Sequence, residues 1–264
     1  MRRILAVALT VALATSVARA EERPAALRDV AFAQRLGVEV PLDVPFRDEN
    51  GAAVTLRRYT GKPILLVPAY YTCPMLCTLV LNGVVSALRA LPFDVGDAFT
   101  VVTFSFDPKD GPEAAAAKRA TYLGEYRRQG AETGWHFLTG DVASIAALTD
   151  AIGFHATYDE TNHQYAHASG IVLLTPAGRV TRYFFGVEFA PRDLRLGIVE
   201  ASAEKIGTVV DQLLLFCFHY DPVTGRYSRL ALDAVRTGGV LTIAALATAI
   251  GWWLRRERSR GAVA

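Results

Sequence analysis

The chain runs PILLVPAYYTCPMLC over residues 63–77. Its first part, 63–67, is a continuous apolar run, which is typical of a strand buried on both faces. From Met75 to Leu91 apolar residues recur at helical spacing, so a helix is expected to follow. Cys73 and Cys77 lie where the strand ends and the helix begins. The stretch therefore predicts a buried strand that enters a helix, with a cysteine pair at the junction.

The rest of the chain repeats this order of strand and helix. Strands are expected at 53–56, 99–106 and 135–138, a hairpin at 170–174 and 179–185, and helices at 112–126, 142–152 (with Asp141 as N-cap) and 193–206. A parallel crossover needs its helix to lie over the sheet, so the order predicts an α/β class with a mixed sheet and flanking helices. Thioredoxin-like folds have this order, and other small mixed-sheet folds share it.

The first twenty residues have the pattern of a signal peptide. Arg2 and Arg3 precede an apolar stretch at 4–17, and Ala18-Arg19-Ala20 supplies small residues around a cleavage site. We therefore expect a signal peptide at 1–20 and a lead-in segment at 21–34, with an uncleaved N-terminal anchor as the alternative. A domain at 35–212 would then lie in the periplasm.

A second apolar segment, 238–254, is free of charged residues and ends in Trp252 and Trp253. It predicts a transmembrane helix that anchors the chain in the bacterial inner membrane, after a juxtamembrane segment at 213–237. The arginine-rich tail, 255–264, is expected on the cytoplasmic side. The alternative is a buried core helix.

The chain has a net charge of +2, but its positive charge comes from the two ends and the region between them is acidic. The first twenty residues contribute +3 and the tail another +3, so residues 21–254 carry a net charge of −4. No basic patch for nucleic acid is evident. The length of the body suits a single domain with one core.

Three cysteines are too few for a disulfide scaffold, so the close pair needs a chemical explanation. Residues four apart lie on one face of a helix, so this separation allows either a disulfide or a shared soft metal, with Cu(I) and zinc as leading candidates. Cys73, nearer the helix start, should be the more acidic thiol. His163 and His167 are expected in a polar loop before the strand at 170–174 and are candidate third ligands, whereas His136 is expected to be an ordinary strand residue.

Three motifs carry a family resemblance: Cys73-Pro74-Met75-Leu76-Cys77, Ser105-Phe106-Asp107-Pro108, and His167 placed nine residues before Pro176. Over about residues 35–210 the chain resembles the Sco/SenC family of thioredoxin-like copper proteins, which help to assemble the copper A centre of cytochrome c oxidase. The resemblance implies that Cys73, Cys77 and His167 bind copper, with His163 in reserve. Asp107 either organises the loop near the site or only terminates its strand.

The chain departs from the family pattern in two places. Thr78 replaces a proline after the second cysteine, and no aspartate precedes His167 to orient the imidazole, so the tautomer of His167 is left open. Neither departure removes a ligand.

The resemblance implies a periplasmic copper metallochaperone whose partners are the copper-binding subunit of the oxidase and an external thiol reductant. The alternative is a membrane-anchored thiol-disulfide oxidoreductase that reduces the copper-ligand cysteines of that subunit. A structural disulfide is a third possibility, although closing so short a loop removes only about 2 kcal/mol of unfolded-state entropy. Cys217 and His219 are either a buried cysteine with an unrelated neighbour or an accessory copper site or partner contact.

Overall fold

The structure is a computed structural model that describes residues 30–73, 75–206, 220–221, 226–227 and 229–261. Three of the predicted strands lie side by side and parallel at its centre, β4 (Ile64–Ala69), β5 (Thr100–Ser105) and β6 (Trp135–Leu138). Every residue of β4 and β5 is buried, as strands covered on both faces require.

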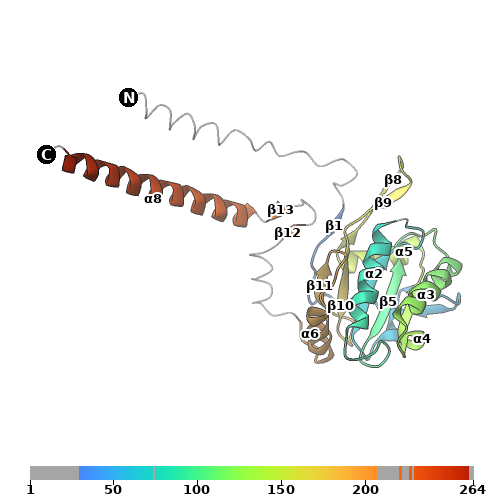
Figure 1. The fold of residues 1–264 in the computed structure, drawn as a ribbon. Coiled ribbons are helices and arrows are strands. Elements are labelled where there is room, and N and C mark those ends of the chain that lie inside the picture. Colours follow the sequence, from blue (N-terminus) through green and yellow to red (C-terminus); the bar gives the residue numbers. More distant parts are fainter. Residues whose placement is uncertain (1–29, 74, 207–219, 222–225, 228, 262–264) are drawn as a thin grey trace.

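An antiparallel hairpin completes the sheet. Its strands are β10 (Gly170–Leu174), which pairs with β4, and β11 (Val180–Phe185) at the edge. The strand order is therefore β11-β10-β4-β5-β6 (Figure 1). This mixed sheet confirms the predicted α/β class.

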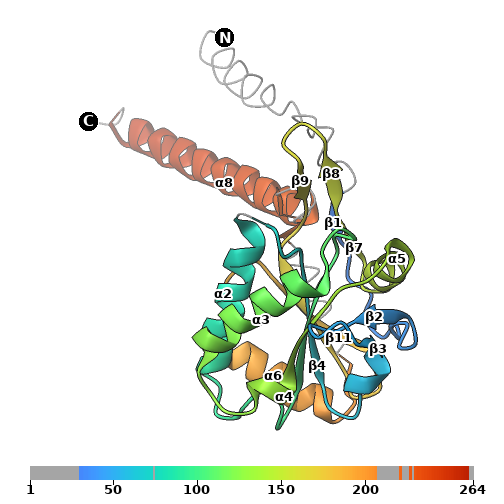
Figure 2. The same cartoon turned by 90° about the vertical axis from the view of Figure 1, so that its right-hand side faces the viewer.

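Helices cover both faces of the sheet (Figure 2). On one side lie α2 (Leu76–Arg89), α3 (Pro112–Tyr126) and α6 (Pro191–Ser202). The other side carries α5 (Val142–Ala151) and two strand pairs, β1 (Ala31–Phe32) with β7 (Phe154–His155), and β2 (Pro45–Arg47) with β3 (Ala53–Thr55). The short helices are η2 (Leu56–Tyr59) and α4 (Ala131–Gly134).

The predicted elements differ from the structure mainly between β7 and β10. The polar stretch that contains His163 was expected to be a loop, but it forms a hairpin of β8 (Thr157–Asp159) and β9 (Gln164–Ala166), which projects from the domain (Figure 1). The expected lead-in, 21–34, also ends inside the fold, because β1 pairs with β7 and Val30 is buried.

The C-terminal region contains a small hairpin, β12 (Tyr220–Asp221) with β13 (Arg226–Tyr227), and the helix α8 (Arg229–Gly261). The predicted transmembrane segment, 238–254, lies within α8. In the described part of the chain, however, no helix has the length and apolar character that crossing a membrane requires, so this prediction is not supported.

Three other predictions fall outside the described residues. They are the signal peptide at 1–20, the position of Pro74, and the constellation of Cys217 and His219.

Candidate metal centre

The segment after β4 carries the cysteine pair across the carboxyl edge of the sheet. β4 ends at Ala69, and α2 begins at Leu76, so Cys77 lies in the first turn of the helix whereas Cys73 precedes it. The sequence spacing suggested that both cysteines would share one helix face. Instead, Cys73 lies outside the helix and faces the backbone N–H groups of its first turn.

Cys73 and Cys77 are both free thiols, both buried, and in direct contact. The backbone N–H of Cys77 donates to the Sγ of Cys73 over 3.3 Å. The Cys77 thiol also donates to Cys73 and, together with backbone N–H donors, outweighs burial and lowers the pKa of Cys73 to about 3. Burial raises the pKa of Cys77 far above its usual range, and the adjacent Cys73 adds to this effect. Cys73 is thus the more acidic thiol, as predicted.

His167 reaches the cysteines from the segment between β9 and β10. Its Nε2 lies 3.4 Å from the Sγ of Cys77, and its Nδ1 lies 2.9 Å from the carbonyl oxygen of Ala168. A carbonyl oxygen only accepts, so Nδ1 carries the hydrogen and the lone pair of Nε2 points towards the thiols. A backbone carbonyl therefore fixes the tautomer in place of the missing aspartate.

The three side chains form a group that could hold one metal ion. One ligand atom from each of Cys73, Cys77 and His167 lies within 4.8 Å of the other two. In a three-coordinate site, bonds of about 2.0–2.3 Å place the ligand atoms roughly 3.7–4.0 Å apart, so closure on a shared ion needs a movement of no more than about 1 Å. Two thiolates and an imidazole are a donor set that soft ions prefer, and Cu(I) fits it.

Aromatic rings enclose His167. The ring of Phe106 lies 5.1 Å from the imidazole, and those of Tyr70 and Phe154 each lie 6.1 Å away, measured between centroids. Tyr70 also donates its backbone N–H to the Sγ of Cys77 over 3.4 Å. These rings limit access of water to the imidazole and hold it facing the cysteines.

The side chain of Asp107 makes a hydrogen bond within its own turn. Its Oδ1 accepts the N–H of Lys109 over 2.9 Å, as the strand-terminator interpretation predicts, and lies 3.4 Å from the hydroxyl of Tyr165. Asp107 is not a member of the metal-binding group among the described residues.

Asp110, which the sequence analysis did not single out, anchors the cysteine segment. Its Oδ2 accepts both the backbone N–H of Tyr71 and the hydroxyl of Ser105, each over 2.6 Å. Burial raises the pKa of Asp110 in spite of these hydrogen bonds. The carboxyl fastens the chain two residues before Cys73 to the turn that leads from β5 into α3. The only sequence signal was its place in Asp107-Pro108-Lys109-Asp110.

The other histidine predictions have simple outcomes. His163 lies in the exposed β8–β9 hairpin, with its Nδ1 3.5 Å from the hydroxyl of Tyr158, and is not part of the metal-binding group. His136 lies on β6, with its Nε2 3.1 Å from the carbonyl oxygen of Thr133 and its Nδ1 3.7 Å from Glu49. It is a strand residue with partners, as expected.

Comparison with known proteins gives consistent matches. The SCO1/SenC family model matches residues 40–199. A relative from Stutzerimonas stutzeri, named "Putative copper-binding protein", is 25% identical over 135 residues, which is 50% of this chain and 62% of that protein. The match thus spans less than two thirds of that relative.

Among solved structures, a protein from Aquifex aeolicus VF5 is 28% identical with a TM-score of 0.56, over 64% of this chain and 95% of that one. Arabidopsis thaliana ScoI, solved with copper bound, is 18% identical with a TM-score of 0.50, over 61% of this chain and 96% of that one. The second likeness concerns the fold alone.

The sheet is thioredoxin-like, and two thiols and an imidazole lie together at one edge of it. These features define the class: a thioredoxin-like protein whose thiols and imidazole form a site for a soft metal. Because the family model covers more than half of the sequence, the chain belongs to the SCO1/SenC family.

Proposed function

We propose that this protein is a periplasmic copper metallochaperone that holds one copper ion between Cys73, Cys77 and His167. The observation that carries the proposal is the convergence of two sulfurs and one Nε2 within 4.8 Å, since this is a donor set for a soft ion. The copper-binding name of the relative from Stutzerimonas stutzeri supports the choice of metal.

The compartment and the recipient belong to the same proposal. The signal-peptide pattern at 1–20 supports export to the periplasm. One solved relative is described as a member of the Sco family of cytochrome c oxidase assembly proteins. We infer that the cargo copper is destined for the copper-binding subunit of an oxidase, where it contributes to the copper A centre.

Each ligand has a distinct part in binding. Cys73 is a thiolate over the whole physiological range, because its pKa is lowered to about 3, and so it offers a ready anionic donor. Cys77 keeps its proton until copper displaces it, so loading releases a proton. His167 supplies a neutral donor whose orientation depends on the Ala168 carbonyl.

The test is anaerobic Cu(I) titration of the reduced chain against a competing chelator. We expect one copper per chain, a loss of at least 100-fold in affinity for Cys73→Ser or Cys77→Ser, and of about 10- to 100-fold for His167→Ala. His163→Ala, a histidine outside the group, is the matched control and should bind as the original chain does. Reduced protein that takes up no copper would overturn the proposal.

A second candidate is thiol-disulfide exchange, favoured by the different acidities of the two thiols. The Cys73 thiolate would attack a partner disulfide, forming a mixed disulfide and releasing one partner thiolate, which takes the proton of Cys77. Cys77 would then attack Cys73, releasing the second partner thiolate and leaving a Cys73–Cys77 disulfide. Two electrons thereby pass to the partner, and an external dithiol reductant must return them.

His167→Ala separates the two candidates, because exchange needs only the thiols. The chaperone proposal requires this variant to lose copper affinity and to fail in copper transfer to the oxidase subunit. If the variant still restores the copper A centre at the original rate, the exchange activity is the working one.

A further inference from the structure

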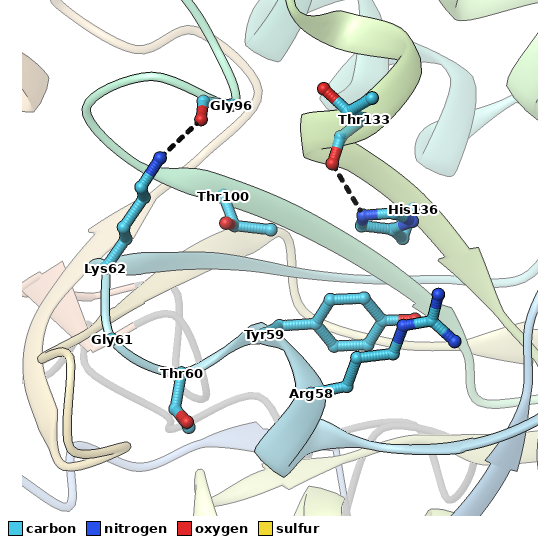
Figure 3. Close-up of a pocket in the computed structure, with 9 residues that line it drawn as sticks. All are labelled: Arg58, Tyr59, Thr60, Gly61, Lys62, Gly96, Thr100, Thr133 and His136. Atoms are coloured by element: carbon cyan, nitrogen blue, oxygen red, sulfur yellow. Dashed lines mark hydrogen bonds between the residues drawn. The ribbon is translucent and has the colours of Figure 1, made fainter.

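A polar hollow lies at the edge of the sheet opposite to the one that carries the cysteines. The strands β4, β5 and β6 are parallel, so their amino ends share one edge, and Lys62, Thr100 and His136 lie there. The hollow has a volume of about 440 Å³ (Figure 3). Because a water in the liquid takes about 30 Å³, the hollow has room for a hydrated small ion.

The charge of the hollow is positive. Arg58 and Lys62 line it, and no aspartate or glutamate does. Within the described residues neither forms an ion pair, and Lys62 donates its Nζ only to the carbonyl oxygen of Gly96, over 2.7 Å. The neighbouring Arg57, in contrast, pairs with Asp43 outside the hollow. Two cationic side chains therefore face the hollow without a counter-ion.

Two hydroxyl groups in the lining also lack partners. Thr100 and Tyr59 are 9% and 6% exposed, and neither hydroxyl has a hydrogen bond with another described residue. Among the described residues neither oxygen is a buried atom without a partner, so both hydroxyls are accessible to a ligand that enters the hollow. Figure 3 shows Thr100 and Tyr59 between Lys62 on one side and His136 on the other.

The wall beside Arg58 is held by a buried ionic cluster. The imidazole of His136 packs on the ring of Tyr59 with centroids 4.5 Å apart, and Glu49 contacts it from outside the hollow. Glu49 is itself paired with Arg119 over 3.0 Å, so its charge has a separate partner. This arrangement keeps the shape of the hollow without placing an acid in it.

We propose that this hollow binds a small oxyanion group, a phosphate or a carboxylate, between Arg58 and Lys62, with the hydroxyls of Thr100 and Tyr59 as hydrogen-bond donors. A delocalised oxyanion has several acceptor oxygens, which can accept from the planar guanidinium, the ammonium and both hydroxyls together. The site is independent of the copper-binding proposal, because it lies at the other edge of the sheet.

The experiment is titration of the ¹⁵N-labelled full chain with inorganic phosphate and, in a second arm, with acetate, both against chloride at matched ionic strength. We expect saturable shifts of the backbone amides of Gly61, Lys62, Thr100 and Thr133 in at least one arm. The arm with the tighter binding identifies the preferred oxyanion. Shifts that are equal in chloride, or that never saturate, would overturn the proposal.

Variants give the second readout. The double variant Arg58→Gln/Lys62→Gln should weaken binding at least tenfold, and Thr100→Val should weaken it a few-fold. Arg57→Gln, next in sequence but paired with Asp43, is the control and should bind as the original chain does. Unchanged affinity in the double variant, with its thermal unfolding also unchanged, would show that the hollow is not the site.

Discussion

The backbone N–H of Cys77 donates to the Sγ of Cys73 over 3.3 Å, so the first turn of α2 stabilises a negative charge on the sulfur that precedes it. The same two residues differ in burial, since Cys77 is 2% exposed and Cys73 is 7% exposed. One sulfur is therefore prepared as a thiolate, while the other stays protonated until a metal or an electrophile arrives.

The two thiols should differ in how their alkylation depends on pH. We expect Cys73 to react with iodoacetamide at a rate that is almost constant from pH 8 down to pH 5, because its pKa is lowered to about 3. Cys77 should react slowly throughout, because its raised pKa keeps it a thiol. Peptide mapping by mass spectrometry after short exposures measures both rates. In Cys77→Ala the Cys73 profile should move to higher pH, since the largest stabilising contact is gone. An unmoved profile would contradict this account.

Asp110 should be needed for the position of the cysteine segment. Asp110→Ala removes the acceptor of both the Tyr71 N–H and the Ser105 hydroxyl, and buried donors without partners cost about 1–3 kcal/mol. We expect a loss of this size in the free energy of unfolding, measured by urea denaturation, and weaker copper binding because the chain before Cys73 is released. Asp97→Ala, at an exposed aspartate, should change stability by less than about 0.5 kcal/mol. Equal stability of the two variants would remove the anchoring role.

Local patterns in the sequence were enough to predict the buried strands and the cysteine pair. The run that became β4 is continuously apolar, β5 places Val101, Val102 and Phe104 among hydroxyl residues, and Cys73 follows the end of β4 by four residues, so neither prediction depends on distant contacts. The tautomer of His167 could not be predicted, because its acceptor is the backbone of Ala168, which any residue would supply. Asp110 was missed because its partner Tyr71 is 39 residues away.

The expectations that the structure does not support also have physical reasons. The β8–β9 hairpin is mostly polar and its strands are half-buried, so it shows no apolar alternation from which strands could be predicted. The transmembrane prediction rested on a charge-free run at the lower limit of length, where an apolar run and a spanning helix are hard to tell apart.

Glu49 should make stability depend on pH below neutrality. Burial opposes its charge, but the adjacent His136 and a hydrogen bond from the Phe137 N–H outweigh burial and lower its pKa to about 2. A carboxyl whose pKa falls on folding stabilises the fold above its unfolded pKa of about 4.3, and this stabilisation is lost as the pH falls towards 2. Glu49→Gln should therefore cost about 1–3 kcal/mol at pH 7 and progressively less between pH 4 and pH 2.

Urea denaturation at pH 7, 4 and 2.5 measures that difference. Glu160→Gln, at an exposed glutamate, is the control and should follow the original chain at each pH. A Glu49→Gln penalty that stays constant with pH would assign the effect to packing and not to charge.

Alanine substitutions at Gly83 and Gly124 make a matched pair that tests how closely α2 packs against the rest of the domain. A Cβ on Gly83, in α2, would lie 1.9 Å from the carbonyl oxygen of Val187, which belongs to the segment between β11 and α6. A Cβ on Gly124, in α3, would have no atom within 4 Å. Gly83→Ala should therefore destabilise the chain by about 1–3 kcal/mol, whereas Gly124→Ala should stabilise it by about 0.5–1 kcal/mol.

The same pair tests how far the metal centre depends on helix packing. α2 carries Cys77, so a helix pushed away from Val187 moves one sulfur relative to His167, whose Nε2 is 3.4 Å away. We expect Gly83→Ala to weaken copper binding in addition to its effect on stability, and Gly124→Ala to leave copper binding unchanged. Thermal unfolding and Cu(I) titration of both variants measure the two effects separately. If Gly83→Ala lowered stability but bound copper with the original affinity, the cysteine segment would be held by Asp110 and Tyr70 rather than by the position of the helix.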